Sequence, residues 1–257
     1  MQLGLVTYMW GAEWDLPTII KSCESAGFAG VELRTSHKHG VELPLTEPQR
    51  KDVAKRFSDS KTRLVGLGTA CEYHSPDAAV LKKNVEDTKA YIRLCHDVGG
   101  SGVKVRPNGL PKGEDPRRTL EQIGAALDEV AEYGAGYGVE IRLEIHGPGT
   151  ALLPNVKKIM DASSHEGSRL CWNCNPEDTQ GHGLEANFKL VKDRLGATIH
   201  IHDLISGYPW QQFFGLLRGV NYDGWTLLEE GSPTADPLRV MSYYRLLWEY
   251  MTGEQCS

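Results

Sequence analysis

The sequence predicts an α/β fold, a single-domain (β/α)8 TIM barrel over residues 1–257, and three observations favour it. Short apolar stretches alternate with longer helical patterns along the whole chain, which is typical of parallel strands joined by helices. We count eight such stretches, the number that closes this kind of barrel. No Ser/Pro-rich linker or shift in composition divides the chain, and 257 residues with 40% hydrophobic content are enough for one large core.

The expected strands are short and lie at regular intervals along the chain. An open, doubly wound sheet is the alternative, but it would carry a Gly-rich phosphate turn after the first strand, and Tyr8-Met9-Trp10-Gly11 is not such a turn. The clearest expected helix follows Asp115-Pro116, where an N-cap and a proline precede apolar residues at helical spacing. We place the strands at Leu3–Tyr8, Gly30–Arg34, Arg63–Gly68, Gly102–Arg106, Val139–His146, Arg169–Asn173, Thr198–His202 and Trp225–Glu229.

Charge and composition point to a small-molecule partner. The net charge is −6 and the pI is about 5.9, which argues against a nucleic-acid or anionic-membrane surface. No stretch approaches the roughly 18 apolar residues of a membrane span. The N-terminus carries no secretory signal pattern, so we expect a cytoplasmic protein with its six cysteines reduced. The oligomeric state stays open, a homo-oligomer included.

Several expected strands alternate apolar and ionisable residues instead of being apolar throughout. The odd-numbered residues from Val139 to Ile145 share one face, and the even-numbered residues from Glu140 to His146 share the other. Burying unpaired charge is costly, so these groups must pair, be hydrated or bind an ion. We expect a polar, functional barrel interior; structural ion pairs that fill the barrel are the alternative. The same pattern places Glu32 with Arg34, Lys104 with Arg106, and Thr198 with His200 and His202 on inward faces.

Five segments at the strand ends carry a resemblance to a known family. They are Gly30-Val-Glu-Leu-Arg34, Leu143-Glu-Ile-His146, Leu170-Cys-Trp-Asn173, Ile199-His-Ile-His-Asp203 and Leu227-Leu-Glu229. In this order they resemble the xylose-isomerase-like superfamily of sugar isomerases and epimerases, which also includes inosose dehydratases and abasic-site endonucleases. The resemblance spans essentially the whole chain.

The resemblance implies a divalent metal ion at the C-terminal mouth of the barrel. In the family a Glu, an Asp, a His and a Glu at the ends of strands five to eight hold the ion, and Glu144, His200 and Glu229 match three of these positions. Asn173 stands at the Asp position, which removes one charge. The other candidates at these positions are Asn175 and Asp178 in place of Asn173, and Glu230 in place of Glu229.

The residue types themselves favour a hard cation. Two carboxylates, one imidazole and one amide suit Mn²⁺ or Mg²⁺ and tolerate Co²⁺ or Zn²⁺. A metal ion that chelates a carbonyl and its neighbouring hydroxyl acidifies the C–H between them, and a nearby carboxylate can then take and return the proton. Glu144 and Glu229 are the natural pair for that step.

Polar and aromatic residues near the same strand ends are candidates for substrate contact. A loop histidine is commonly a solvated surface group, yet these loops should border the site; we expect His74 and one of His37 and His39 to contact substrate. Lys104 and Arg106 either offset the carboxylates or bind an anionic group, and Trp10 either lines the pocket or packs in the core. The full set is His37, His39, His74, His146, His202, Lys104, Arg106 and Trp10.

The leading functional hypothesis is a metal-dependent isomerase or epimerase of a keto sugar or related polyol. A lyase of the inosose-dehydratase type shares the first proton abstraction and is the alternative. A sugar-binding barrel without catalysis is a third hypothesis, since Asn173 weakens the metal site. Abasic-site DNA cleavage is a fourth, and the acidic charge of the chain argues against it.

Overall fold

Eight parallel strands form a closed barrel in which the strand order is β1 to β8. The computed structural model describes residues 1–256; Ser257, the last residue of the expected domain, lies outside the described residues. The predicted barrel is therefore confirmed. The strands are β1 (Gln2–Val6), β2 (Gly30–Arg34), β3 (Arg63–Glu72), β4 (Gly102–Arg106), β5 (Glu140–Glu144), β6 (Ser168–Trp172), β7 (Leu195–Ile201) and β8 (Trp225–Leu228).

A helix follows each strand, and several helices begin at a residue that caps them. Asp115 accepts a hydrogen bond from the Arg117 N–H at 2.9 Å, and Pro116 is the first helical residue, as predicted. Within residues 1–256, no helix has both the length and the apolar character needed to cross a membrane. The helices are α1 (Leu16–Ala26), α2 (Glu47–Ser58), α3 (Ala78–Asp97), α4 (Pro116–Ala135), α5 (Leu153–Ala162), α6 (Leu184–Val191), α7 (Trp210–Gly219) and α8 (Pro237–Thr252), with short 3₁₀ turns η1 (Pro176–Thr179) and η2 (Lys192–Arg194).

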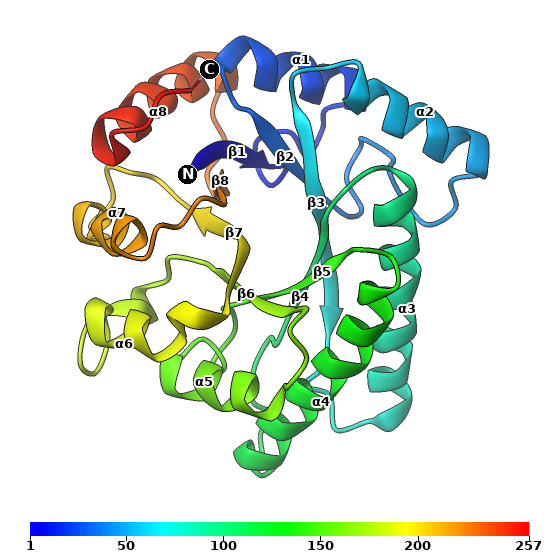
Figure 1. The fold of residues 1–257 in the computed structure, drawn as a ribbon, viewed down its shortest axis with the longest axis vertical. Helices are drawn as coiled ribbons and strands as arrows, with labels where there is room; N and C mark the ends of the chain where they lie inside the picture. Colours follow the sequence, from blue (N-terminus) through cyan, green and yellow to red (C-terminus); the bar gives the residue numbers. More distant parts are fainter. Residues whose placement is uncertain (257) are drawn as a thin grey trace. The chain divides into compact units, whose positions relative to one another are not determined.

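The chain divides into two compact units, and the first consists of Met1–Gly68, Asp97–Gly100 and Ala197–Ser257. In this unit β1 pairs with both β2 and β8, and β8 pairs with β7, all in parallel. Helices α1 and α8 lie side by side (Figure 1). A small apolar cluster of Val6, Val65, Trp225 and Leu227 fills the space between strands of this unit.

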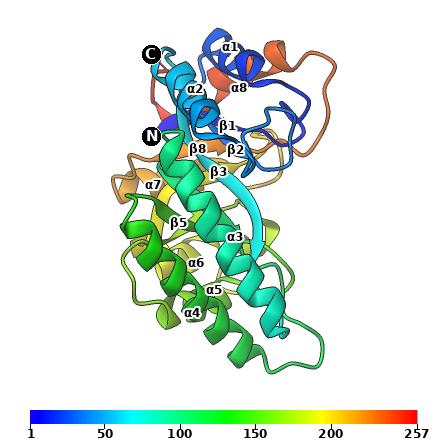
Figure 2. The ribbon, with the colours of Figure 1, turned by 90° about the vertical axis from the view of Figure 1, so that its right-hand side faces the viewer.

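The second unit consists of Thr69–His96 and Ser101–Gly196. Here β5 pairs with β4 on one side and β6 on the other. Helices α3 and α4 run alongside each other (Figure 2) and are joined by Lys89–Glu129 and Arg93–Tyr133 contacts at 2.7 and 2.6 Å. Trp172 at the end of β6 packs its ring against Phe188 of α6, with ring centroids 5.7 Å apart.

Six strands end at residues other than those predicted, and the differences at β3 and β5 bear on the candidate site. β3 runs on to Glu72, four residues beyond its expected end, and Asn84 accepts a hydrogen bond from the Glu72 N–H. β5 ends at Glu144, because the chain turns soon afterwards at Gly147, whose φ is +91°. His146, which was predicted to lie within this strand, therefore lies in the loop after β5.

A buried arginine sits over the second unit's own backbone at the start of β4. Arg142 is 1% exposed, and its guanidinium donates to Glu140 Oε1 at 2.7 Å and to Ser101 Oγ at 3.0 Å. A Cβ at Gly102 would lie 2.2 Å from Arg142 Cζ, so only glycine leaves room for this side chain. Gly102 thus leaves room for the Arg142 guanidinium to reach Glu140 and Ser101, which accept its hydrogen bonds.

We therefore expect Gly102→Ala to lower the free energy of unfolding by about 1–3 kcal/mol, because the methyl group overlaps the Arg142 guanidinium. The control is Gly215→Ala in α7, where the nearest atom to the new Cβ is 3.9 Å away; it should be neutral or raise the stability by up to about 1 kcal/mol. Denaturant unfolding of the purified variants measures both values. A Gly102→Ala protein as stable as the control would mean that the guanidinium is not held over Gly102.

Candidate functional site

Glu144 lies at the end of β5 between a cation and an amide of its own unit. Its Oε2 is 2.5 Å from Lys104 Nζ, and its Oε1 accepts a hydrogen bond from Asn173 Nδ2 at 3.0 Å. All three side chains are buried. The parallel register explains the grouping: Lys104 aligns with Arg142, and Glu144 aligns with Cys171, so strand neighbours two residues apart meet on one face.

The buried charges of β4 and β5 are thus paired. Arg142 pairs with Glu140, and Lys104 pairs with Glu144. The structural alternative, ion pairs that fill the interior, describes Glu140 and Arg142 well. It also gives Lys104 one of its two expected roles, since its ammonium offsets a carboxylate.

His200 lies near the end of β7 and faces two carboxylates of its own unit. Its Nδ1 is 3.5 Å from Glu229 Oε2, and its Nε2 is 3.2 Å from Glu32 Oε1. His200 aligns with Leu227 in the β7–β8 register, and the Glu229 N–H donates to the Ile201 carbonyl, which continues the parallel pairing. Glu229 therefore shares the face of His200. Glu230 takes no part in this group, and its Oε1 accepts a hydrogen bond from the Ser232 N–H.

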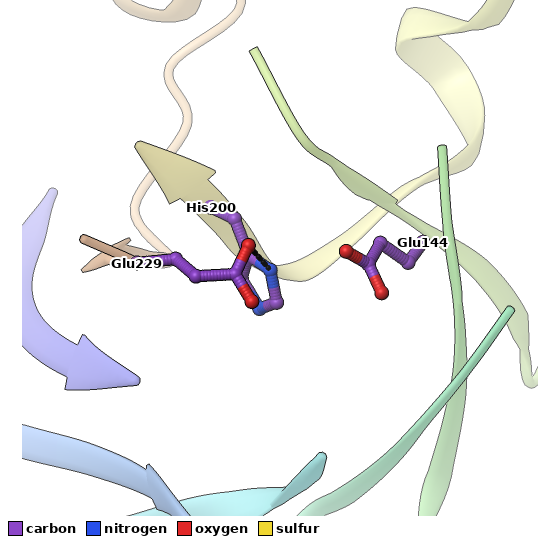
Figure 3. A group of neighbouring side chains, drawn as sticks. All are labelled: Glu144, His200 and Glu229. Atoms are coloured by element: carbon purple, nitrogen blue, oxygen red, sulfur yellow. Dashed lines mark ion pairs between the residues drawn. The ribbon is translucent and has the colours of Figure 1, made fainter. Parts of the chain in front are cut away.

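Glu144, His200 and Glu229 form a group that could hold a metal ion (Figure 3). Each side chain offers one ligand atom, and these atoms all lie within 4.8 Å of one another. Glu144 and His200 are buried and Glu229 is half-buried. Two carboxylate oxygens and one imidazole nitrogen are a donor set that Mn²⁺, Mg²⁺ and Zn²⁺ all accept, so the residues present fit a divalent ion.

The amide and carboxylate candidates after β6 have different surroundings. The Asn173 amide donates its Nδ2–H to Glu144. If the amide were rotated by 180°, its oxygen would face the Glu144 oxygen, so the hydrogen bond defines the amide orientation. Asn175 Nδ2 donates to the Ile145 carbonyl at 2.5 Å and anchors the loop. Asp178 is buried in η1, where its carbonyl accepts from Asn187.

A second polar cluster lies where β3 and β4 end, and two of its four residues were predicted from the sequence. Glu72 Oε1 accepts hydrogen bonds from Arg106 Nη2 and from Asn108 Nδ2, both at 2.6 Å. His74 Nδ1 lies 3.8 Å from Glu72 Oε2. Arg106 and His74 were predicted; Glu72 and Asn108 were missed because β3 runs beyond its expected end. The signal that could have found Glu72 is its position two residues before His74.

The two histidines after β2 differ in their hydrogen bonds. His39 Nδ1 accepts from the Val41 N–H at 3.0 Å, and Nε2 lies 2.7 Å from the Arg34 carbonyl, so both ring nitrogens bind backbone. Burial lowers the pKa of His39. His37 is half-buried; burial is the main cause that lowers its pKa, and the charge of Arg34 adds to it. Of the two, His37 is the better placed to contact a substrate.

The three remaining candidates are held by backbone groups or lie in loops. Trp10 is buried, and its Nε1–H donates to the Ser232 carbonyl at 2.9 Å. His202 follows β7, and its Nδ1 lies 2.8 Å from the Glu229 carbonyl oxygen. His146 is half-buried in the loop after β5, and its carbonyl accepts from Thr150 Oγ1.

The His39 hydrogen bonds predict a stability effect that depends on pH. At pH 8, His39→Ala should lower the free energy of unfolding by about 1–3 kcal/mol, because both backbone hydrogen bonds are lost. The pKa of His39 is lower in the folded protein than its ordinary value of about 6.5, so the wild type loses stability as the pH falls below that value. The difference in unfolding free energy between the wild type and His39→Ala should therefore narrow. Chemical denaturation at pH 8 and pH 5.5 measures it. His182→Ala, at an exposed loop position, is the control; a His39→Ala protein that matches it at both pH values would contradict the assigned bonds.

Two comparisons with known sequences match most of the chain. A family model described as a xylose isomerase-like TIM barrel matches residues 20–243. An L-ribulose 3-epimerase of Methylomonas sp. (strain DH-1) is 23% identical over 270 residues, which cover 96% of this chain and 92% of that protein.

Solved structures share the fold over nearly the whole chain. A structure of the IolI protein with a binding zinc atom has a TM-score of 0.84 at 15% identity and covers 98% of both chains. D-psicose 3-epimerase from Clostridium cellulolyticum H10, solved with D-tagatose, has a TM-score of 0.81 at 15% identity and covers 98% of this chain and 99% of its own. At these identities the likeness establishes the fold.

Proposed function

Since the chain belongs to the xylose isomerase-like TIM barrel family, we propose that it is a divalent-metal-dependent isomerase or epimerase of a keto sugar or related polyol. The observation that carries the proposal is the group of Glu144, His200 and Glu229, whose ligand atoms lie within 4.8 Å of one another. The relatives named as L-ribulose and D-psicose 3-epimerases support a ketose as the substrate class.

Glu144, His200 and Glu229 are the residues that would hold the ion. Mn²⁺ or Mg²⁺ suits the two carboxylates best, and the zinc in the IolI structure makes Zn²⁺ a competitor. When bound, a divalent ion polarises a substrate carbonyl and acidifies the neighbouring C–H.

The two carboxylates have different surroundings and therefore different tasks. Glu144 is fixed by Lys104 and Asn173, which orient its carboxyl group. Glu229 is 12% exposed, against 3% for the side chain of Glu144, and is therefore the carboxylate with more access to a bound substrate. We assign to Glu229 the removal of the proton next to the carbonyl, and to Glu144, entering the step protonated, the delivery of its own proton to the opposite face.

The cluster of Glu72, His74, Arg106 and Asn108 is the proposed binding site for the sugar hydroxyls. It offers a carboxylate acceptor together with guanidinium, amide and imidazole groups. Glu72 lies 2.6 Å from Arg106 and offsets its positive charge. A phosphate group at this position would therefore find no unpaired cation and would be repelled by the Glu72 carboxylate. This favours an unphosphorylated sugar. His37, His146 and His202 remain candidates for further hydroxyl contacts.

The function is tested by removing one carboxylate at a time. Glu144→Gln and Glu229→Gln should each lower kcat for epimerisation by about 100-fold or more, because each removes a ligand charge and a proton carrier. Turnover on a panel of ketoses, with product analysis for released water, separates an epimerase from a lyase. Circular dichroism and the Glu230→Gln control, whose acid lies outside the group, show whether the fold and general charge are unaffected. Near-normal turnover in either variant would remove that residue from the mechanism.

Asn173 sets a second prediction, on metal affinity. Asn173→Asp should tighten divalent-metal binding by about tenfold or more, because it adds a negative group 3.0 Å from Glu144 Oε1. The same change should destabilise the metal-free protein, since two carboxylates then replace an amide–carboxylate hydrogen bond. Calorimetric titration and thermal unfolding without metal give the two readouts. Equal metal affinity in the variant and the wild type would mean that the side chain at position 173 does not interact with the ion.

A further inference from the structure

Glu32 on β2 is a buried carboxylate that the proposed mechanism does not use. It is 0% exposed, and neither of its oxygens accepts a hydrogen bond from the described part of the chain. An ionisable neighbour is His200, whose Nε2 lies 3.2 Å from Glu32 Oε1. Burying a carboxylate costs several kcal/mol unless an opposing charge or donor repays part of it. We therefore expect Glu32 to act on His200, the residue that it faces.

The neighbouring strand makes room for this carboxylate. A Cβ at Gly68 would lie 2.8 Å from Glu32 Oε1 and 3.5 Å from its Cδ. Glu32 aligns with Gly66 on β3, and Gly68 is the residue two positions along the same face. The absence of a side chain at Gly68 thus leaves the space that the Glu32 carboxylate fills beside the imidazole.

The two ring nitrogens of His200 face two carboxylates that differ in burial. Nε2 faces Glu32, which is fully buried, and Nδ1 faces Glu229, which is partly exposed and belongs to the candidate metal group. A neutral imidazole carries one proton, so the nitrogen that donates cannot also bind a metal ion. Histidines that bind metals generally donate their other N–H to a carboxylate or carbonyl, which orients the ring and raises its basicity.

We propose that Glu32 is a positioning residue: when His200 binds an ion, Glu32, 3.2 Å from Nε2, accepts the Nε2–H and so leaves Nδ1 as the metal-binding atom. The inference rests on the proposed metal role of His200 and assigns the ligand nitrogen and the residue that selects it. Glu32 itself does not touch the ion. Its effect reaches the metal through the orientation and tautomer of one imidazole.

The first test is a calorimetric titration of Zn²⁺ and Mn²⁺ into the whole protein. Glu32→Leu, which removes the acceptor, should weaken metal binding by about 10- to 100-fold. Glu32→Gln keeps an acceptor oxygen without the charge and should weaken binding less. Gly68→Ala, which pushes on the carboxylate from β3, should also weaken binding and keeps the test open if Glu32→Leu fails to fold. Glu230→Gln removes an acid outside the group and should leave the affinity unchanged.

A second readout separates positioning from a structural role. In the Zn²⁺-loaded wild type, the ring ¹⁵N–¹H spectrum should show His200 protonated at Nε2 with Nδ1 bound to zinc, the His200 signals being assigned by their loss in His200→Gln. Zinc on Nε2 would overturn the proposal, as would unchanged affinity in Glu32→Leu and Gly68→Ala while the wild type binds metal. A wild type that binds no divalent ion would overturn both this inference and the proposed function, so the two failures are distinguishable.

Discussion

The cost of burying charge is the constraint on which the candidate site depends. The strands of this barrel carry ionisable residues at alternate positions, and each buried group meets an opposing group within its own unit. In the second unit Arg142 pairs with Glu140 and Lys104 pairs with Glu144; in the first, His200 lies between Glu32 and Glu229. Pairing explains why these charges are tolerated. Apolar residues at these positions would avoid that cost, and the proposed metal ion and polar substrate would give the charged residues a role.

The departure at Asn173 is best understood together with Lys104. An Asp at position 173 would add a negative charge beside Glu144, whereas this chain places an amide donor there and a lysine ammonium on the other carboxylate oxygen. Asn173 and Lys104 thus both hold the Glu144 carboxyl group in place without requiring an ion. The site should therefore bind a divalent metal less tightly than one with three carboxylates, and the bound metal should keep more of its charge for the substrate carbonyl.

Strand periodicity made much of this structure predictable. The bounds of β2 and β4 agree with the prediction, because both are short apolar stretches that begin at a glycine and end at an arginine. Alternation of side chains placed Glu144 and His200 on inward faces, and the family resemblance singled out these two residues and Glu229 as metal ligands. In the structure the Glu229 side chain lies beside His200, and the Glu230 side chain accepts a hydrogen bond from the Ser232 N–H.

The residues that sequence reasoning missed depend on contacts between segments far apart in the chain. Glu72 and Asn108 meet only because β3 continues past its apolar stretch, and no local pattern marks that extension. Glu32 was assigned to the inward face, but its partner His200 is distant in sequence. His39 looked like a site residue until its two hydrogen bonds to backbone were visible.

We propose that this site transfers a proton beside a carbonyl with the help of a divalent ion. The most direct measurement is solvent exchange: the protein is incubated in D₂O with unphosphorylated ketoses, with Mn²⁺ or with a chelator, and deuterium in the recovered sugars is measured by mass spectrometry. We expect one deuterium on a carbon next to the carbonyl in the Mn²⁺ sample and none in the chelated sample. Equal deuterium incorporation with and without metal, or none on any ketose of a broad panel, would contradict the account.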